Sequence, residues 1–371
     1  MAKFRKIGIL SSGGDAPGMN AAIRAATRRA LSQGLEVVGI LGGYAGLLNA
    51  ADESDPGVVR QKYLRPFDTT SVSNIVTRGG TILYSSRCPE FKTPEGMAKA
   101  LKACHDHQID AVIAIGGDGT FRGATDLTNH GIPSIGIPAT IDNDITATEQ
   151  TIGFDTALNT ALTMFDALRD TAESHARCIV TEVMGNGCGF LSLYLALATG
   201  AISVAIPEIT FDREYAIKKI REAREECNKR GIIAICGEGM PKINGMDYGE
   251  DFKEEIVART GIDTRYTKMG HIIRGGNPTL RDRLTATQMG VEAVNMLLEG
   301  RSNLVMCVNE NRISSADINF ALVLDKMYKN KLKDGDLEGF TGYQIAQMKA
   351  RCEARHAKIQ RLYKMAYDIS M

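Results

Sequence analysis

Short apolar runs alternate along the chain with segments in which apolar residues recur every three or four positions. The short runs predict buried strands, at Lys6–Leu10, Glu36–Ile40, Ala111–Ile115, Ser134–Ile137, Cys178–Val183, Ser203–Ile206, Ile232–Cys236 and Leu304–Val308. The periodic segments predict helices, with stripes at Met19, Ile23, Ala26 and Ala30, at Leu158, Leu162, Phe165 and Leu168, and at Ile217, Ile220 and Ala223. This alternation predicts an α/β fold with parallel sheets, whose ligands bind in the loops at the carboxyl ends of the strands.

Two stretches depart from this alternation. Residues 52–70 are polar and include Pro56 and Pro66, which predicts an irregular surface loop. Residues 331–342 contain three glycines and several charges, which predicts a linker.

A last helix is predicted at about Tyr343–Ala366, with one apolar face formed by Ile345, Met348, Cys352, Ile359, Leu362 and Ala366. Between residues 349 and 364 this helix has six Lys or Arg and one Glu. We interpret it as a solvated basic helix docked on the body or on a neighbouring subunit, in preference to nucleic-acid or membrane binding.

Composition narrows the class of protein. The 371 residues suffice for two domains, and 44% of them are apolar and 24% charged. The 44 Lys and Arg residues balance 44 Asp and Glu residues, which argues against a broad basic face for nucleic acid. The eight cysteines form no CxxC pair, so a zinc site of clustered thiols is not supported. We expect free thiols in a reducing cytosol.

One charge-free stretch, Val183–Pro207, is long enough to span a membrane. Glycines and a proline interrupt it, and a loop, a buried helix at Gly189–Thr199 and a buried strand at Ile202–Ile206 explain it better. The apolar run near the N-terminus is too short for a signal peptide. We therefore expect a cytoplasmic protein without a membrane partner.

Two glycine-rich loops follow predicted strands. Residues 11–18 (SSGGDAPG) come before a helix predicted to start at about Pro17, which suits a loop that cradles phosphate, although a tight structural turn is the alternative. Residues 116–120 (GGDGT) allow a nucleotide to approach the backbone closely. Asp118 in this loop can hold a magnesium ion directly or through water. The alternative is that Asp118 only caps the next helix.

Two further loops carry charged side chains. In residues 138–144 (PATIDND), Asp142 and Asp144 form an acid–base and metal constellation, with a turn rich in side-chain hydrogen bonds as the alternative. In residues 270–276 (GHIIRGG), His271 and Arg274 lie between glycines. Arg265 precedes this loop and Arg177 precedes a buried strand, so these side chains resemble an anion-binding cluster.

These loops, in this order, resemble the phosphofructokinase family. The matching segments are GILSSGGDAPGMNAAIR, RCPEF, AIGGDGTFRGA, IPATIDNDI, TIGFDTAL, SHAR, EVMG, GEGM and GHIIRGGNPTLRDR. The resemblance covers roughly residues 4–325. GGDGT alone is also similar to lipid kinases and nicotinamide-dinucleotide kinases, whereas TIDND together with GHIxRGG is far more specific.

The resemblance implies two Rossmann-like αβα domains with parallel sheets and an active site in the cleft between them. The nucleotide-binding domain is expected at residues 1–145 plus about 266–312. The sugar-phosphate domain is expected at about 146–265 plus 313–330, and residues 331–371 are expected to be the linker and C-terminal helix. The implied reaction is ATP-dependent phosphorylation of fructose 6-phosphate to fructose 1,6-bisphosphate in glycolysis, with Mg²⁺ as the cofactor.

The resemblance also assigns roles to single residues. Asp142 is the base that takes the hydroxyl proton, Thr140 and Asp144 lie at the phosphoryl and metal position, and Thr140 and Asp142 also contact the substrate. The ATP site comprises Gly14, Arg87, Cys88, Gly117, Asp118, Gly119, Thr120 and Gly123, of which Asp118 holds Mg²⁺ and Arg87 is also catalytic. The sugar is assigned to Met184, Gly185 and Glu238, and its 6-phosphate to His271 and Arg274. Arg177 and Arg265 match residues that reach in from a neighbouring subunit, which implies a homotetramer with shared active sites.

Some positions depart from the family pattern. Gly119 leaves room for a nucleoside and no Lys precedes TIDND, which favours ATP over pyrophosphate; Ala139, however, is not the usual Gly of the ATP-dependent branch. Asn186 stands where a basic residue normally follows EVMG, and loss of one such charge can cost about 10²–10³ in rate. The effector site matches at Arg24, Arg28, Arg169 and Lys229, but Ile202 replaces a metal-holding Glu. Regulation by ADP and phosphoenolpyruvate is therefore not indicated.

Three functions remain open on these residues. The leading one is an ATP-dependent phosphofructokinase. The second is a kinase of the same family that uses pyrophosphate or another sugar phosphate, which Asn186 would permit. The third is a weakened regulatory paralogue that only binds ligands. Retention of Asp118, Asp142 and Asp144 argues against the third, because a protein that only binds needs no base.

Overall fold

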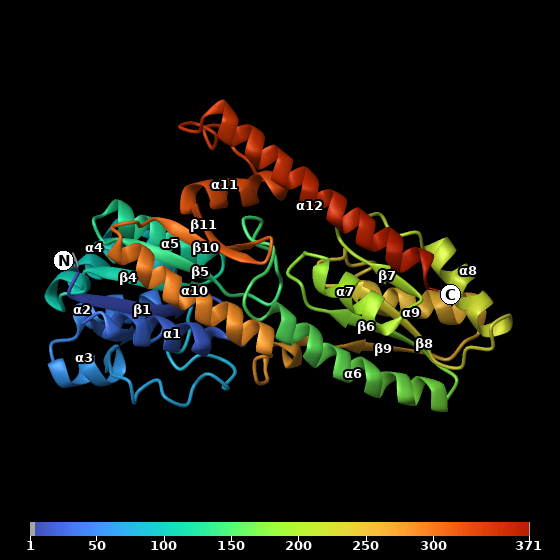
Figure 1. Ribbon diagram of the computed structural model, residues 1–371. Coiled ribbons are helices and arrows are strands. Elements are labelled where there is room, and N and C mark those ends of the chain that lie inside the picture. The colour runs from blue at the N-terminus through green and yellow to red at the C-terminus, as the bar shows by residue number, and fades with distance from the viewer. Residues whose placement is uncertain (1–3, 371) are drawn as a thin grey trace. The chain divides into compact units, whose positions relative to one another are not determined.

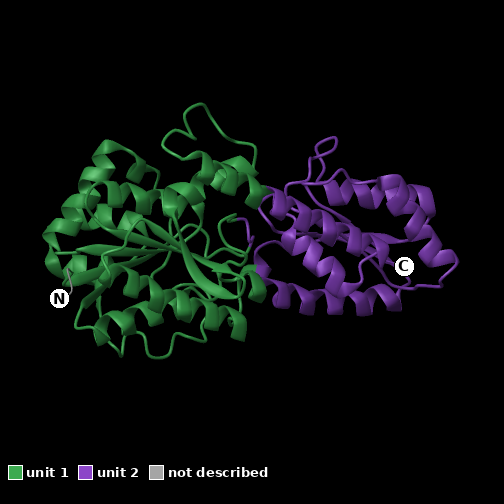
Figure 2. Ribbon diagram, turned by 45° about the horizontal axis from the view of Figure 1, so that its top comes forward, with its two compact units in different colours: residues 1–141, 145–156, 274–352 green, residues 142–144, 157–273, 353–371 purple. Residues whose placement is uncertain are grey.

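The computed structural model describes residues 4–370, and the chain divides into two compact units (Figure 2). Unit 1 comprises residues 1–141, 145–156 and 274–352, and unit 2 comprises residues 142–144, 157–273 and 353–371. Each unit is built around its own sheet (Figure 1). The α/β class with parallel sheets expected from the sequence is confirmed.

The sheet of unit 1 has seven strands in the order β11-β10-β5-β4-β1-β2-β3. Their bounds are β1 (Lys6–Ser12), β2 (Glu36–Ile40), β3 (Leu64–Phe67), β4 (Ala111–Gly116), β5 (Ser134–Pro138), β10 (Leu304–Asn309) and β11 (Arg312–Asp317). The five inner strands run parallel, whereas β3 and β11 pair antiparallel at the two edges. β4 and β5 are buried along their whole length, which is why they read as continuous apolar runs.

Helices connect the strands of unit 1. Their bounds are α1 (Met19–Ser32), α2 (Tyr44–Asp52), α3 (Pro56–Lys62), η1 (Pro89–Lys92), α4 (Pro94–Asp106), α5 (Asp118–Asn129), α10 (Leu280–Leu298) and α11 (Ile318–Tyr328). α1 packs against α10, α2 against α4, and α5 against α11. From β1 the chain proceeds through α1 to β2 on one side, and from β4 through α5 to β5 on the other. The strand order therefore reverses between β1 and β4, and the loops after these two strands meet at the position where open α/β sheets bind ligands.

Unit 2 contains a four-stranded parallel sheet in the order β7-β8-β6-β9. Its strands are β6 (Cys178–Val183), β7 (Ser203–Ala205), β8 (Ile232–Gly237) and β9 (Thr264–Lys268). Its helices are α6 (Phe154–Ser174), whose first residues belong to unit 1, α7 (Phe190–Thr199), α8 (Arg213–Glu225), α9 (Tyr248–Thr260) and η2 (Gly270–Arg274), whose last residue belongs to unit 1. The core includes Ile217, Ile220 and Ala223, the third predicted stripe.

The last helix, α12 (Gly342–Asp368), follows an irregular segment at 332–341, as the sequence predicts. Its residues up to Cys352 belong to unit 1 and those from Glu353 onward to unit 2. Met348, Cys352, Ile359 and Ala366 of the predicted apolar face are buried. α12 is therefore docked on the body of its own chain, one of the two positions that we expected.

The structure departs from the expectations in three respects. Residues 52–70 are not an irregular loop, because α3 and β3 lie within them. The strands β9 and β11 were missed. The compact units also divide at other residues than the expected domains: residues 146–156 and 313–330 lie in unit 1, and residues 142–144 and 266–273 lie in unit 2. Residues 313–330 belong with unit 1 because β11 pairs with β10 and α11 packs on α5.

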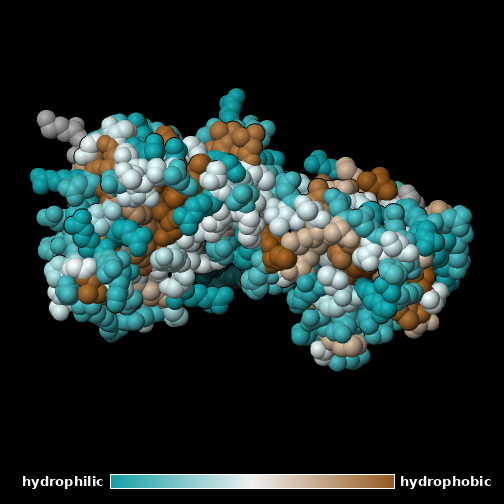
Figure 3. Space-filling view, turned by 90° about the horizontal axis from the view of Figure 1, so that it is seen from below, coloured by the Kyte–Doolittle hydropathy of each residue, from teal (hydrophilic) through white to brown (hydrophobic). Residues whose placement is uncertain are grey.

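The surface bears on membrane association. Hydrophilic residues cover much of the face drawn in Figure 3, and hydrophobic residues are exposed there in separate patches. Among residues 4–370, no helix is both long and apolar enough to cross a membrane. The charge-free stretch 183–207 divides into a loop, α7 and β7, as expected.

Candidate functional site

The loops after β1 and β4 are joined by direct contacts in unit 1. Ser12 and Gly116 are paired in the parallel register of these strands. The Thr120 hydroxyl donates to the Ser12 carbonyl oxygen at 2.9 Å. A Cβ atom at Gly116 would lie 2.2 Å from that same oxygen, so a larger residue would push the two loops apart. The two predicted glycine loops are therefore in direct contact at the point where the strand order reverses.

The second loop leaves space for a ligand. Cβ atoms built at Gly117 or Gly119 would have no described atom within 4 Å. α5 begins directly at Asp118. The Thr120 and Phe121 N–H groups donate to the Gly117 carbonyl oxygen at 2.9 and 3.2 Å, whereas the N–H groups of Asp118 and Gly119 stand before them at the helix N-terminus, where the helix supplies no acceptor. This open helix N-terminus fits the phosphates of a nucleotide.

Asp118 has the chemistry of a metal-holding residue. Its Oδ2 accepts a hydrogen bond from Arg122 at 2.7 Å, whereas its buried Oδ1 has no hydrogen-bond partner among the described residues. Among residues 4–370, no three His, Cys, Asp or Glu side chains are grouped to hold a metal ion. A divalent cation at Asp118 would therefore complete its coordination with phosphate oxygens and water, which is the usual manner for Mg²⁺.

Arg274 contacts the first glycine loop. Its Nη1 donates to the Asp15 carbonyl oxygen at 3.0 Å, and a Cβ atom at Gly14 would lie 2.5 Å from the same nitrogen. Gly14 is thus required for the close approach of the guanidinium. His271, three residues earlier, belongs to unit 2. The two residues that we expected to bind one phosphate therefore belong to different units.

The segment that carries Arg87 and Cys88 is hydrogen-bonded to the same region. The Ser85 hydroxyl donates to the Gly13 carbonyl oxygen, and the Ser86 hydroxyl donates to that of Gly42 at 2.7 Å. Cys88 is half-buried, and burial raises the pKa of its thiol. These serines hold the segment directly before Arg87 and Cys88 against the β1 loop and against Gly42.

Gly123 has a packing role that the sequence did not indicate. A Cβ atom there would lie 2.5–2.8 Å from the Tyr44 ring, and the buried Tyr44 hydroxyl donates to the Thr120 carbonyl oxygen at 2.6 Å. Burial raises the pKa of Tyr44 above its usual range. Tyr44 thus stabilises the 116–120 loop through its hydrogen bond to Thr120, and the absence of a side chain at Gly123 leaves space for the Tyr44 ring.

The segment after β5 connects the two units. In unit 1, the Thr140 N–H donates to the Ile152 carbonyl oxygen at 3.1 Å, and the Thr151 hydroxyl donates to the Thr140 carbonyl oxygen at 2.6 Å. Asp142 and Asp144 belong to unit 2 and flank Asn143. Asn143 is buried and has a φ of 51°, in the left-handed region. The expected base and its neighbouring carboxylate are therefore presented on a tight turn.

In unit 2, the loops after β6 and β8 form one group. The Glu238 carboxylate accepts the N–H of Gly185 at 3.1 Å and the N–H of Asn186 at 3.0 Å. The Asn186 amide nitrogen lies 3.5 Å from Asp144 Oδ2. Gly185 and Glu238 are thus joined by a hydrogen bond, and Met184 directly precedes Gly185 in the chain. Asn186, expected only as a missing charge, contacts one of the two carboxylates.

His271, Arg177 and Arg265, the three basic residues of unit 2 that were predicted to bind anions, do not all lie at the same end of the strands of its sheet. β9 neighbours β6, so His271 follows the carboxyl end of the sheet, on the same edge as Glu238 and Asn186. Arg177 precedes β6, and its Nε donates to Asp263 Oδ2 at 2.6 Å. Arg265 lies 3.2 Å from the same carboxylate. The sequence could not show that these two arginines share an aspartate away from the remaining residues.

A sequence model of the family described as phosphofructokinase matches residues 6–297. An ATP-dependent 6-phosphofructokinase of Halalkalibacterium halodurans is 45% identical over 315 residues, covering 85% of this chain and 93% of that protein. One from Clostridium tetani is 46% identical over 329 residues, covering 89% and 97%.

Solved structures show the same fold. The phosphofructokinase of Saccharomyces cerevisiae superposes with a TM-score of 0.79 at 30% identity, covering 88% of this chain. This chain spans 46% of the length of the yeast chain. A pyrophosphate-dependent phosphofructokinase of Nitrosospira multiformis has a TM-score of 0.71 at 18% identity, covering 85% of this chain and 83% of its own, which supports the fold alone.

Proposed function

The chain belongs to the phosphofructokinase family, and from this premise we propose that it transfers the γ-phosphoryl group of ATP to the 1-hydroxyl of fructose 6-phosphate. The observation that carries the proposal is the open loop at Gly117–Gly119 at the head of α5, where the strand order reverses. A nucleoside triphosphate needs a backbone without side chains over its phosphates and a helix N-terminus facing them. The carboxylates of the turn 142–144 supply the chemistry that a binding module does not need.

In the proposed reaction, the 1-hydroxyl oxygen attacks the γ-phosphorus and the bond to the oxygen bridging the β- and γ-phosphates breaks. ADP leaves, and the hydroxyl proton passes to the Asp142 carboxylate. Thr140 and Asp144 are assigned to the transferred group, and Arg87 is assigned the role of offsetting its negative charge. Asp118, whose buried Oδ1 has no hydrogen-bond partner among residues 4–370, is the residue that would hold Mg²⁺. That ion would neutralise phosphate charge and orient the donor.

The nucleotide is assigned to Gly14, Arg87, Cys88, Gly117, Asp118, Gly119, Thr120 and Gly123. The sugar is assigned to Met184, Gly185 and Glu238, and its 6-phosphate to His271 and Arg274. Arg177 and Arg265 are assigned to the active site of a neighbouring subunit. Their place at the other edge of the unit 2 sheet from Glu238 supports that assignment, and we propose a homotetramer in the cytosol on this ground and on the free thiols.

The test is a coupled assay for ADP formation on the purified protein, together with the Asp142→Asn variant. Wild type is expected to turn over fructose 6-phosphate with ATP and poorly with pyrophosphate. The variant is expected to lose about 10²–10⁴ in kcat, because the amide cannot accept the proton. Calorimetric binding of fructose 6-phosphate should persist in the variant, which distinguishes loss of the base from loss of the fold.

Two results would contradict the proposal. Near-normal turnover by Asp142→Asn would remove Asp142 as the base. Wild-type preference for pyrophosphate would remove ATP as the donor. As a control, Asp334→Asn changes an exposed carboxylate in the segment before α12 and should leave kcat unchanged.

A further inference from the structure

An arginine interrupts the apolar face of α12. The buried positions Met348, Cys352 and Ile359 recur every three or four residues, and Arg355 occupies the one place in this series that is not apolar. Only 9% of its surface is exposed. A buried guanidinium costs free energy unless it is paired, whereas an apolar side chain would fill the same place without that cost. The contacts of Arg355 therefore indicate what it contributes.

Arg355 contacts the turn that carries the two carboxylates. Its Nη2 donates a hydrogen bond to the carbonyl oxygen of Asn143. Its guanidinium lies over the Phe190 ring, 4.7 Å from the ring centroid. All three residues belong to unit 2. Arg355 is thus held between the first residue of α7 and the turn 142–144.

The Asn143 carbonyl is a point at which the turn can be fixed. Asn143 has a φ of 51° and is 2% exposed, and Asp142 and Asp144 flank it directly. The Asn143 carbonyl belongs to the peptide plane that joins Asn143 to Asp144, so fixing this carbonyl limits the rotation of that plane, and Asp142 is bonded to Asn143 on the other side. Charge-assisted hydrogen bonds to a guanidinium are roughly twice as strong as neutral ones.

The charge of Arg355 also acts on the Cys188 thiol, which Asp144 influences as well. Burial raises the pKa of the Cys188 thiol to about 12; Arg355 opposes that shift, while Glu208 and Asp144 add to it. Arg355 and Asp144 are therefore both close enough to Cys188 to act on it. Asn186, which contacts Asp144, carries no charge. Through its bond to Asn143, Arg355 supplies a cation to the carboxylate turn, and Asn186 of the loop after β6 supplies none.

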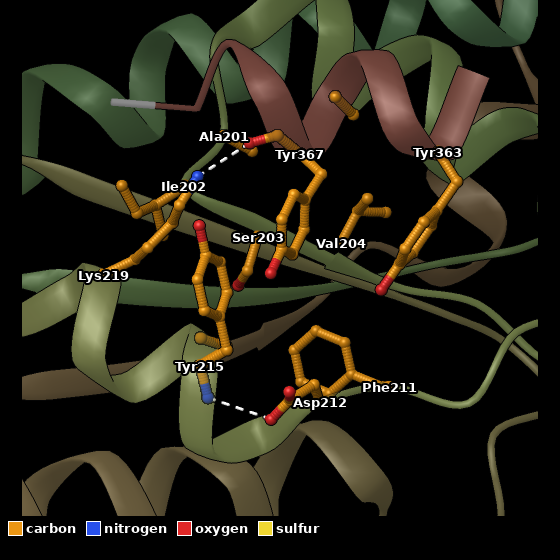
Figure 4. A pocket seen from close by; sticks show the side chains of 12 residues that line it. Ala201, Ile202, Ser203, Val204, Phe211, Asp212, Tyr215, Lys219, Tyr363 and Tyr367 are labelled. Carbon is orange, nitrogen blue, oxygen red and sulfur yellow. Dashed lines mark hydrogen bonds between the residues drawn. The ribbon is translucent and has the colours of Figure 1, made fainter. Parts of the chain in front are cut away.

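The end of α12 is anchored independently of Arg355. The Lys219 ammonium donates to the Tyr367 carbonyl oxygen at 2.7 Å and to the Ser370 hydroxyl at 2.6 Å. The Tyr215 and Tyr367 rings stack at 4.4 Å in the small pocket drawn in Figure 4. Loss of Arg355 would therefore leave the helix docked through these contacts, so the effect on the turn can be measured separately.

We propose that Arg355 of the C-terminal helix is a positioning residue that holds the Asp142–Asp144 turn in its reactive conformation through the carbonyl of Asn143. This inference rests on the proposed function, in which Asp142 is the base. The family model match ends at residue 297, well before α12 begins at Gly342. The positioning contact thus comes from a helix outside the part of the chain that the family model describes.

The test compares Arg355→Met with Lys358→Met. Both residues lie on α12 with their charge over the Phe190 ring, and Arg355 in addition donates to the Asn143 carbonyl oxygen. Arg355→Met is expected to lower kcat about 10- to 100-fold, the scale of about 1.5–3 kcal/mol for a hydrogen bond to a charged group. Its KM values for ATP and fructose 6-phosphate should stay within about threefold, because binding groups are retained. Lys358→Met should keep kcat within about twofold, and Arg355→Lys should fall between them.

A second measurement does not depend on activity. Amide hydrogen exchange followed by mass spectrometry should be faster in peptides covering residues 140–148 of Arg355→Met, and unchanged there in Lys358→Met. Unchanged exchange in Arg355→Met, or equal losses of kcat in the two Met variants, would overturn the positioning role. Absence of wild-type turnover would instead overturn the proposed function, and the exchange comparison would still decide whether Arg355 holds the turn.

Discussion

Arg274 and His271 stand three residues apart in one loop, yet the structure gives them different neighbours. Arg274 donates to the Asp15 carbonyl oxygen and lies close to Gly14 in unit 1. His271, by contrast, is exposed after the carboxyl end of β9 in unit 2. A change at Arg274 would therefore disturb the glycine loop as well as any phosphate it binds. A change at His271 would remove one side chain and leave the loops intact.

We predict that the two alanine variants differ in their kinetics. His271→Ala should raise KM for fructose 6-phosphate about 10-fold or more and leave KM for ATP nearly unchanged, because one hydrogen bond to a charged phosphate is lost. Arg274→Ala should raise both KM values, because the β1 loop loses its guanidinium. Steady-state kinetics with each substrate varied in turn provide the measurement. Equal effects of His271→Ala on both substrates would contradict its assignment to the sugar phosphate.

At the scale of elements, the β4–α5 connection contains a position, Gly119, where a substitution is expected to affect nucleotide binding without lowering the stability of the fold. Gly117 caps α5 without a side chain, Asp118 is its first residue and Gly119 its second. The space around a Cβ atom at Gly119 is open among the described residues. A carboxylate in the first turn of a helix is favourable to the helix, because it faces the positive end of the dipole. The same carboxylate would repel the phosphates of a nucleotide.

Gly119→Asp is therefore expected to weaken ATP use without weakening the fold. We predict at least about a 10-fold loss in kcat/KM for ATP, roughly the effect of one unfavourable charge contact of about 1.4 kcal/mol. The thermal midpoint should stay the same or rise. Gly342→Asp at the start of α12 is the matched control, since a Cβ atom there also meets nothing within 4 Å among the described residues. A lowered midpoint or unchanged ATP kinetics would refute the prediction.

The elements that the sequence predicted are those buried on both faces. β1, β2, β4, β5, β6, β7, β8 and β10 all read as apolar runs because helices or neighbouring strands exclude water from them. β3, β9 and β11 lie at sheet edges, and their side chains are only partly buried. Pro66 within β3 also reads as a turn signal, although proline is tolerated on an edge strand. In none of these three strands do buried and exposed positions alternate regularly, so the local sequence shows neither an apolar run nor a period of two.

The candidate site was predictable as a set of loops but not as a set of contacts. The glycine loops and the carboxylate turn were visible because each follows an apolar run. Tyr44, Asn186 and Arg355 act through neighbours that lie 76, 42 and 212 residues away in sequence, and no local pattern encodes such a contact. Two of the three left a signal: Asn186 replaces the basic residue that normally follows EVMG, and Arg355 fills the gap between Cys352 and Ile359 in the apolar stripe of its helix.

At the scale of the whole molecule, the chain passes between the two units several times. One crossing follows Thr156, where α6 leaves unit 1. The Thr156 N–H and hydroxyl both donate to Asp282 of α10, at 2.8 and 2.6 Å. Asp282 is completely buried, and this burial raises its pKa to about 6. A carboxylate thus fixes the chain of unit 1 at the point where it departs for unit 2.

The raised pKa of Asp282 predicts an unusual pH dependence. Below pH about 4 this carboxyl is protonated in both the folded and the unfolded chain, so its full contribution to stability is present. Between about pH 4 and pH 6 the unfolded chain loses the proton first, so stability falls as pH rises. Above pH 6 both states are ionised and the loss is complete, at about 3 kcal/mol for a shift of about two pKa units.

Asp282→Asn should remove this dependence, because the amide does not titrate and its oxygen can still accept from Thr156. Relative to the variant, wild type is therefore expected to lose stability on going from pH 4 to pH 7. Unfolding by urea at several pH values measures the difference, with Asp334→Asn in the exposed segment before α12 as the control that should run parallel to wild type. A gap between wild type and Asp282→Asn that stays constant, or that moves in favour of wild type as pH rises, would show that burial does not govern this carboxyl.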